Sequence, residues 1–432
     1  MAGTARAGLR LDQAAAPTDR AAETGEFLLG SYGALEFAKM PGQPGTISPM
    51  ITSAPAFVIG VALVLVMVWD GFEVIILPRR VTRRFRVSRL FYRNFWRIWR
   101  RLAGLIPSKK HRESAFGIFG PLSLLVLVAV WAVGLVLGFA LMQYGSGSAV
   151  NVAVSVTNAS FWTDAYLSGT TFFTLGLGDV VPRSSLARAL IVVEAGLGFG
   201  FLAGVIGYLP FIFGSFASRE VSITLLDSRA GTPPTAGELL RRHSYPHGLE
   251  ALRELLKEWE LWSAELMESH LSYPVLAYFR SQHDNQSWIA SLTAILDTCS
   301  LVIVGIDGAC ERQAQLTFAI ARHAVVDLSQ VFLTSPKPMQ EDRLPASELH
   351  RIRGVLAEQG LKLHSGEDSD ARLTELRRMY EPYIFALASY LNQTLPPWIP
   401  QKQGKDNWQT TAWGQAAGLI EKPHAYVADD HF

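Results

Sequence analysis

The segment Ser168–Pro182, with the sequence SGTTFFTLGLGDVVP, lies within the most apolar third of the chain and ends in glycine, aspartate and proline. Glycine and proline are the poorest helix formers, so the part from Thr174 to Pro182 cannot continue a regular helix. Apolar stretches long enough to cross a membrane stand on both sides of it. This non-helical run between two spans decides the fold.

Three apolar windows predict membrane-spanning helices, at residues 54–78, 116–143 and 186–216. Each exceeds the roughly 20 residues that a helix rising about 1.5 Å per residue needs to cross a bilayer core. A further apolar run, SLVIVGI at 300–306, lies between Asp297 and Asp307, too close together for a span. We expect it to be a buried turn of a soluble helix bundle.

Basic residues dominate the connection between the first two spans. Thirteen Arg or Lys residues and no Asp or Glu lie between Arg79 and Arg112. The positive-inside rule places this connection in the cytoplasm, residues 144–185 outside, and everything after residue 216 in the cytoplasm. Arginines alternate with apolar residues at helical spacing, which predicts an amphipathic helix on anionic lipid headgroups. A plain topology signal is the alternative.

Two acids, Asp70 and Glu73, lie one turn apart in the first span. Charged groups at mid-bilayer are costly, so we expect them near the inner boundary, paired with Arg79 and Arg80. A functional proton or ion site is the alternative.

The run Phe161–Phe173 is too short to cross a membrane, and the chain must return through TLGLGDVVP. Unpaired backbone survives at membrane depth only when it is buried in protein or lines a wet cavity. Gly176 and Gly178 alternate with leucines, so successive carbonyls could all point to one side. Four such loops around one axis would form rings of oxygens that replace the hydration shell of a cation.

These residues resemble a known family. TLGLGD, Thr174–Asp179, is similar to the potassium-channel signature Thr-Val-Gly-Tyr-Gly-Asp, and TDAYLSGTTFF before it resembles the pore helix. The second and third spans resemble the outer and inner helices of the two-helix pore unit. The likeness covers about residues 116–216. It implies an all-α membrane protein with a re-entrant pore helix and filter, one extra N-terminal span and a helical cytoplasmic C-terminal domain.

The resemblance also implies roles for single residues. Potassium ions would bind to oxygens of Thr174, Leu175, Gly176 and Leu177, with the Thr174 hydroxyl at the inner end. Gly178 would close the outer mouth, and Asp179 would hydrogen-bond behind the filter. The motif occurs once in the chain, so a complete pore implies a homotetramer.

Two positions depart from the family pattern. Leu177 replaces a tyrosine whose hydroxyl braces the filter, and Phe173 stands where threonine is usual. These changes weaken the prediction of strict potassium selectivity but not the prediction of conduction.

The third span carries the remaining site predictions. Glu194 is its only deep ionisable residue, and we expect it to brace the filter through a hydroxyl of Thr170 or Thr171. The alternative is a protonated, buried acid that only packs. Gly198, nineteen residues after Asp179, is predicted to be a gating hinge.

Two further features of this span concern its packing and its inner end. Pro210 is predicted to kink the helix near the cytoplasm, because proline removes a backbone donor. Gly196, Gly200 and Gly204 form a smooth stripe that suits packing against another helix.

The expected organisation has six parts: a disordered N-terminal segment 1–53, whose place in the native protein stays open, a first span 54–78, a basic connection 79–115, a pore domain 116–216, a linker 217–247 and a cytoplasmic helical domain 248–432. The sequence contains no dinucleotide-binding glycine motif, phosphate loop or metal-ligand spacing. The two cysteines are expected to be buried thiols.

The sequence therefore predicts a non-enzymatic, tetrameric cation channel of the plasma membrane. It would conduct potassium, contact membrane lipids, need no cofactor beyond the permeant ion, and bind no nucleic acid, since the net charge is only +1. Alternatives are a weakly selective cation channel, a transporter built from degenerate pore loops, and a membrane-anchored receptor or scaffold with a vestigial pore.

Overall fold

The computed structural model describes residues 53–77, 86–147, 149–152, 155–158, 160–283, 285–306, 310–338, 341–401, 406 and 409. All of them belong to one compact unit, Pro49–Phe432. Apart from Ser53, the segment expected to be disordered lies outside the described residues, as do Arg79, Arg80 and Asp307. The elements of this unit are α1 (Ala54–Ile75), α2 (Val87–Gly104), α3 (Lys109–Gly145), β1 (Ala149–Val152), β2 (Ser155–Asn158), α4 (Phe161–Phe172), β3 (Val180–Pro182), α5 (Ser185–Ala230), α6 (Ala236–Arg242), α7 (Gly248–Ser272), the 3-10 helix η1 (Pro274–Tyr278), α8 (Trp288–Gly305), α9 (Glu311–Val331), α10 (Ala346–Glu358) and α11 (Glu367–Leu391).

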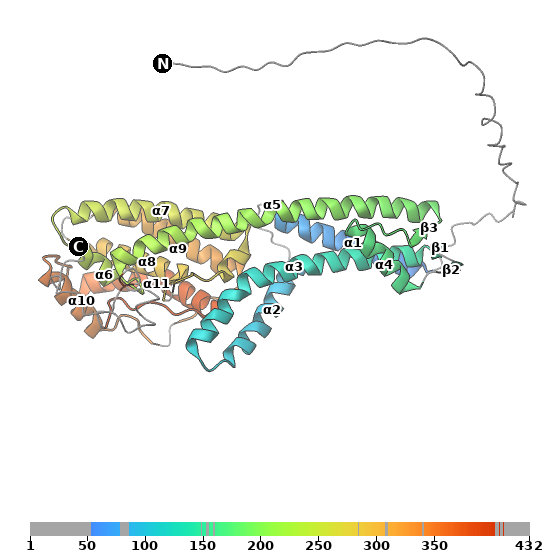
Figure 1. Cartoon of the computed structure of the whole chain (residues 1–432). Coiled ribbons are helices and arrows are strands. Elements are labelled where there is room, and N and C mark those ends of the chain that lie inside the picture. The colour runs from blue at the N-terminus through green and yellow to red at the C-terminus, as the bar shows by residue number, and fades with distance from the viewer. Residues whose placement is uncertain are drawn as a thin grey trace, which may run out of the picture. The chain divides into compact units, whose positions relative to one another are not determined.

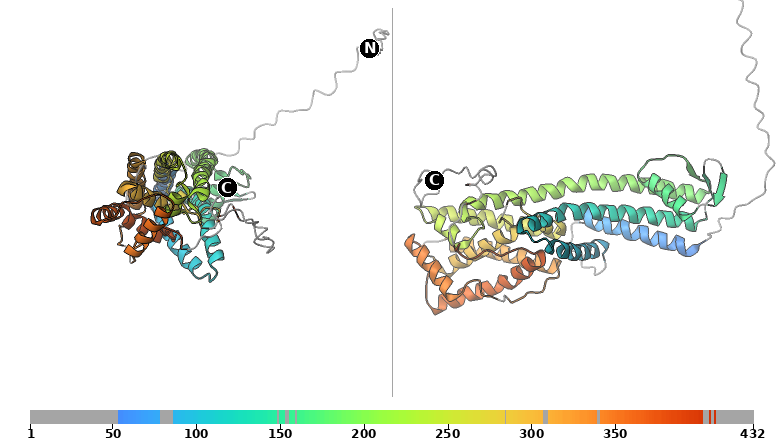
Figure 2. Two further views of the ribbon diagram at one scale, coloured as in Figure 1. Left: turned by 90° about the vertical axis from the view of Figure 1, so that its left-hand side faces the viewer. Right: turned by 60° about the horizontal axis from the view of Figure 1, so that its bottom comes forward.

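Four of the described helices are long and apolar enough to cross a membrane: α1, α3, α5 and α8. Helices α3 and α5 contain the second and third windows predicted from the sequence, and α1 covers the first window up to Ile75; the three helices run alongside one another in Figure 1 and in the right-hand view of Figure 2. Two of them are longer than predicted, because α3 begins at Lys109 and α5 continues to Ala230.

Glycines bring α1 and α3 into close contact. A Cβ added at Gly60 would lie 2.5 Å from the carbonyl oxygen of Gly138, and one added at Gly145 would lie 2.5 Å from the backbone nitrogen of Phe57. In a membrane, where apolar burial gives little driving force between helices, such small residues allow the close packing that holds helices together.

A short helix and a small sheet lie between α3 and α5. The Ser160 side chain caps α4 by accepting a hydrogen bond from the backbone of Thr163, at 3.3 Å. Strand β1 pairs antiparallel with both β2 and β3, in the order β2-β1-β3. The prediction of an all-α fold was therefore wrong at this point. AVNV and SVTN each contain two β-branched residues, a composition that suits paired strands.

The predicted linker 217–247 is helical in its first half, as a continuation of α5 up to Ala230. The described chain remains helical through SREVSITLLDSRA up to Ala230, because no glycine or proline interrupts that stretch. The helix ends at Gly231, whose φ of 80° only glycine adopts readily. Helix α6 then occupies part of the remaining linker.

Helix α8 corrects the interpretation of SLVIVGI as a buried turn. Residues 300–305 form the last part of this 18-residue helix, and Asp297 lies inside the helix instead of before its start. Its length and composition would fit a span, and 94% of its apolar window is buried within the chain. It forms the centre of a group of helices, α6–α11, called here the C-terminal helix group.

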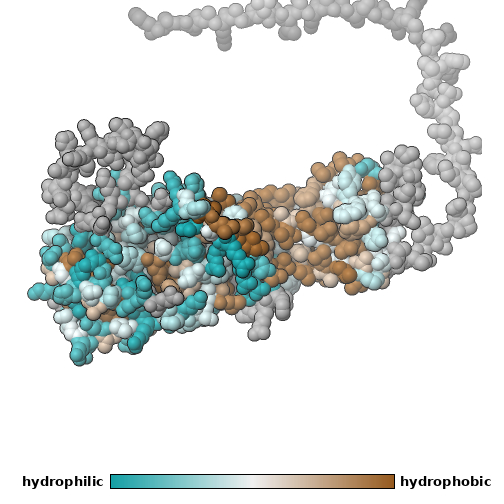
Figure 3. Space-filling model, turned by 90° about the horizontal axis from the view of Figure 1, so that it is seen from below, coloured by the Kyte–Doolittle hydropathy of each residue, from teal (hydrophilic) through white to brown (hydrophobic). Residues whose placement is uncertain are grey.

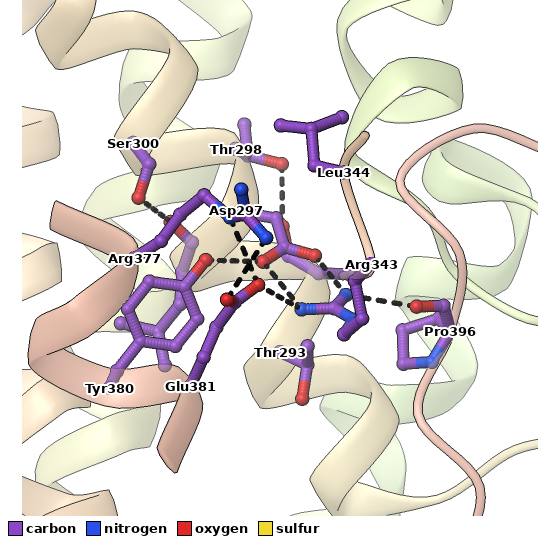
Figure 4. Close-up of polar contacts among 12 residues, drawn as sticks. Thr293, Asp297, Thr298, Ser300, Arg343, Leu344, Arg377, Tyr380, Glu381 and Pro396 are labelled. Carbon is purple, nitrogen blue, oxygen red and sulfur yellow. Dashed lines mark hydrogen bonds and ion pairs between the residues drawn. The ribbon is translucent and has the colours of Figure 1, made fainter. Parts of the chain in front are cut away.

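A network of charges surrounds Asp297 (Figure 4). The carboxylate of Asp297 lies 2.5 Å from Nη2 of Arg343 and accepts a hydrogen bond of 2.5 Å from the hydroxyl of Tyr380. Glu381 pairs with the same arginine at 3.2 Å and with Arg377 at 3.1 Å. This paired network explains how a charged residue is tolerated in the middle of the apolar helix α8.

Arg219, in the last third of α5, joins this helix to the C-terminal helix group. Its guanidinium donates to the carbonyls of Leu276, at 3.0 Å, and Phe279, at 2.9 Å, and it lies 3.1 Å from Nε2 of His270. The indole of Trp262 on α7 donates to the Arg219 carbonyl at 3.3 Å. Side chain and backbone of one residue thus fasten α5 to η1 and α7.

The molecular surface has an apolar part and a hydrophilic part. Figure 3 shows apolar surface over the part that holds α1, α3 and α4, and mostly hydrophilic surface over the C-terminal helix group. An ordinary membrane helix exposes apolar side chains to lipid, as α1 and the first half of α5 do here.

Candidate functional site

The carboxyl end of α4 holds the first half of the TLGLGD segment. The amide of Thr174 donates to the carbonyl of Thr171 at 2.9 Å. The amides of Leu175 and Gly176 both donate to the carbonyl of Thr170, at 2.7 and 3.4 Å. The two threonines that the sequence pointed to thus contact the segment through backbone oxygens. The hydroxyl of Thr170 instead donates to Leu167 within its own helix.

Backbone angles alternate along the segment. Thr174, Gly176 and Gly178 have positive φ values of 57°, 54° and 77°, and the two leucines between them do not. Alternation between the left- and right-handed regions gathers successive N–H groups on one side of a chain, which leaves the carbonyls on the other. Glycine supplies this geometry at two positions without steric cost.

The carbonyl oxygens of residues 174–178 accept no hydrogen bond from any residue that the structure describes. The side chains of Leu175 and Leu177 are also exposed, by 62% and 63%. A row of bare carbonyls is unstable in an apolar medium, because each unpaired polar group costs several kcal/mol there. Among the described residues these carbonyls are therefore free to contact an ion or water.

The C-terminal end of the segment is held by Asp179. Its Oδ2 accepts a hydrogen bond of 2.9 Å from the hydroxyl of Tyr166 on α4, and its Oδ1 accepts one of 3.1 Å from the amide of Val180. The expected role of Asp179 behind a filter stays a prediction. Sequence analysis missed Tyr166. The absence of a tyrosine at position 177 could have prompted a search for another tyrosine on the preceding helix.

Glu194 is fully buried, and its partner differs from the prediction. Its Oε1 contacts the hydroxyl of Ser168 on α4, not Thr170 or Thr171. The same hydroxyl lies 2.8 Å from the carbonyl oxygen of Val136 on α3. The prediction was wrong by about half a helical turn, because counting along the chain cannot tell which face of α4 points toward α5.

Gly198 lies directly against the end of α4. A Cβ at this position would lie 2.1 Å from the carbonyl oxygen of Phe172 and 3.0 Å from its carbon. By contrast, a Cβ at Gly196, Gly200 or Gly204 would meet no atom within 4 Å in the described chain. The glycine stripe is therefore open within one chain, and Gly198 makes a close contact.

The two acids of α1 are buried at its end and hold α2. Asp70 accepts hydrogen bonds from the amide and hydroxyl of Ser88, both at 3.0 Å, and from the indole of Trp131 at 2.8 Å. Glu73 pairs with Arg86 at 3.1 Å. The acids thus act as an anchor for the following helix.

Among the described residues, no group of three or more His, Cys, Asp or Glu side chains could hold a metal ion. The site consists of backbone oxygens and the hydrogen bonds that position them.

Neither the comparison with curated proteins nor that with solved structures found a match. A comparison with protein families did find one, and it covers α4, the TLGLGD segment, and most of the apolar parts of α3 and α5. The matching family is described as ion channel, and the match spans residues 124–210 of this chain, so this part of the chain is similar to a potassium-channel-like ion channel.

Proposed function

We propose that this protein is a tetrameric cation channel that selects potassium through the backbone oxygens of residues 174–178. The observation that carries this proposal is the alternation of φ along five residues whose carbonyls have no partner in the described chain. Four copies around one axis would turn these carbonyls into stacked rings, and such rings can replace the hydration shell of a potassium ion.

In this proposal the oxygens of Thr174, Leu175, Gly176 and Leu177 bind the permeant ion, and Gly178 forms the outer mouth. Asp179 supports the filter through its hydrogen bond with Tyr166. The hydroxyl of Tyr166 thus supports the filter from the pore helix. In the family pattern, the supporting tyrosine is part of the filter itself. Thr170 and Thr171 support the inner half through their carbonyls.

We further propose that Glu194 supports the pore helix as a protonated acid. The hydroxyl of Ser168 has one proton and faces two acceptors, the carbonyl of Val136 and the carboxyl of Glu194. The chain of contacts is complete if Glu194 donates to Ser168 and Ser168 donates to Val136. This arrangement ties α5, α4 and α3 together directly beside the filter.

The inner helix of the proposed pore is α5. Gly198 lets it approach the end of the pore helix, so that any bending there would act directly on the filter's support. Pro210 lacks a backbone donor inside the same helix and is the second proposed bending point. The open stripe of Gly196, Gly200 and Gly204 would face a neighbouring subunit in the tetramer.

The proposed setting is the plasma membrane, with α2 and the C-terminal helix group on the cytoplasmic side. The excess of positive charge around α2 supports this orientation. Because α5 runs unbroken to Ala230, the proposed boundaries become a pore region that includes all of α5 and a cytoplasmic domain that begins at α6.

The test is a potassium flux assay on purified protein in liposomes, with Gly176→Ala as the variant. Gly176 has a positive φ, so alanine strains the filter, although a Cβ there would meet no atom of the chain within 4 Å. Gly354→Ala on α10 is the matched control, since its added Cβ also meets no atom. We expect flux in the wild type and the control and its loss in Gly176→Ala. Equal flux in all three would refute the proposal.

A weakly selective cation channel is the second candidate, favoured by Leu177, whose side chain can brace nothing by hydrogen bonding. Reversal potentials in mixed potassium and sodium separate the two. A shift that follows the potassium gradient supports selectivity, and a potential near zero with potassium on one side and sodium on the other supports the weakly selective pore.

A further inference from the structure

Helix α2 presents two exposed rows of different chemistry. Arg93, Arg97 and Arg101 recur every fourth residue and form one row, because residues four apart lie on one face of a helix. Beside it lies an apolar row of Ile98, Leu102 and Leu105, which are exposed by 55%, 56% and 77%.

The cations of this row have no acidic partner among the residues that the structure describes. No carboxylate forms an ion pair with Arg93, Arg97 or Arg101, and no Asp or Glu occurs in α2 itself. The opposite face of the helix is occupied, since Trp96 is buried and donates to the carbonyl of Tyr390 at 2.9 Å. The exposed rows are thus a fixed surface of a docked helix.

The place of α2 in the fold brings this surface to the membrane boundary. Asp70 and Glu73, in the last part of the first span, bind Ser88 and Arg86 at the start of α2. Exposed apolar side chains, such as Phe72 of α1 at 38% and Ile76 directly after α1 at 64%, lead to this point. Figure 3 shows a patch of mixed apolar and hydrophilic surface where the apolar part of the molecule meets the hydrophilic part.

We propose that the exposed face of α2 binds anionic phospholipid headgroups of the adjacent leaflet. The arginines would contact the phosphates, while Ile98, Leu102 and Leu105 enter the outermost acyl region. Each basic residue close to an anionic surface contributes roughly 1 kcal/mol. A soluble acidic partner would match the charges but would leave the apolar row without a partner of its own kind, which is why a lipid surface fits better.

Spin-labelled lipids test this proposal independently of ion conduction. The full-length protein is placed in phosphatidylcholine vesicles with spin-labelled phosphatidylglycerol or phosphatidylcholine, and the motionally restricted fraction of each label is measured. We expect the wild type to prefer phosphatidylglycerol. The triple variant Arg93→Gln, Arg97→Gln, Arg101→Gln should lose this preference, by up to about fivefold for each arginine, the factor equivalent to roughly 1 kcal/mol.

The matched control is the triple variant Arg253→Gln, Arg312→Gln, Arg372→Gln, which removes three exposed charges from the C-terminal helix group. Arg93→Lys, Arg97→Lys, Arg101→Lys keeps the charges and should keep the preference, even if the glutamine variant fails to assemble. Raising the salt to about 1 M, where screening acts within about 3 Å, should weaken the preference. An equal restricted fraction of both lipids in the wild type, or an equal loss in the control variant, would overturn the proposal.

Discussion

The contact between Gly198 and the end of α4 gives a prediction whose sign separates two roles for this glycine. In Gly198→Ala the new Cβ would lie 2.1 Å from the carbonyl oxygen of Phe172, whereas such atoms keep at least 3.0 Å apart. The two helices would have to separate by about 1 Å at this point. Overpacking of this kind costs about 1–3 kcal/mol, which lowers the population of the native arrangement about 5- to 150-fold.

A glycine that served only as a flexible hinge would give the opposite result. Alanine in a helix interior is more stable than glycine by about 0.8–1.0 kcal/mol, so the variant would then melt at a higher temperature. We expect Gly198→Ala to melt lower and to conduct less potassium. Thermal unfolding followed by size-exclusion chromatography, with liposome flux in parallel, measures both. Gly354→Ala in the interior of α10 is the control, since its Cβ meets no atom within 4 Å. A higher melting temperature with normal flux would refute the contact.

Three further predictions concern buried polar groups. Glu194→Gln keeps a donor toward Ser168 and should retain flux, whereas Glu194→Ala removes this buried hydrogen bond, which contributes about 0.5–1.5 kcal/mol, and should lower flux and melting temperature; equal losses in both variants would contradict the protonated form. Asp297→Ala removes the closer of the two carboxylates paired with the buried Arg343 and leaves it Glu381 at 3.2 Å, so it should destabilise the protein by up to about 3–5 kcal/mol in thermal unfolding; an unchanged melting temperature would show that the pair with Asp297 contributes nothing to stability. Burial alone would raise the pKa of Glu238, but hydrogen bonds and charges from two neighbouring arginines lower that pKa from 4.5 to about 2. Because the folded pKa is the lower one, the stabilisation is present above about pH 4.5 and is lost as the pH falls toward 2, so the difference in melting temperature between wild type and Glu238→Gln should shrink over that range.

The pore part of the fold was predictable because its signals are local and strong. Three long apolar windows, a half-length run and TLGLGD fixed the order of helices and the position of the ion-channel match. The full length of α5 was missed for a different reason. A change from apolar to charged composition at residue 216 marks where a helix leaves lipid, but it does not end the helix, and only Gly231 does so.

Partners that lie across the fold could not be predicted. Ser168 and Thr170 are two residues apart on one short helix, and only the packing of α4 against α5 decides which of them faces Glu194. The position of Asp297 inside a buried helix likewise depends on an arginine 46 residues away. Such long-range pairings produce no local pattern in a single sequence, whereas membrane spans and turns do.

Because α5 is one continuous helix, a rotation at one point along it displaces its far end. At about 1.5 Å per residue, the stretch from Gly198 to Ala230 is about 48 Å long, so a swing of about 10° beside the filter would carry its far end through about 8 Å. Arg219 donates hydrogen bonds to two carbonyls in and next to η1. These bonds would transmit that displacement to the C-terminal helix group. Conversely, a contact that immobilised the C-terminal helix group would restrain the proposed pore from a distance, without contacting the proposed filter.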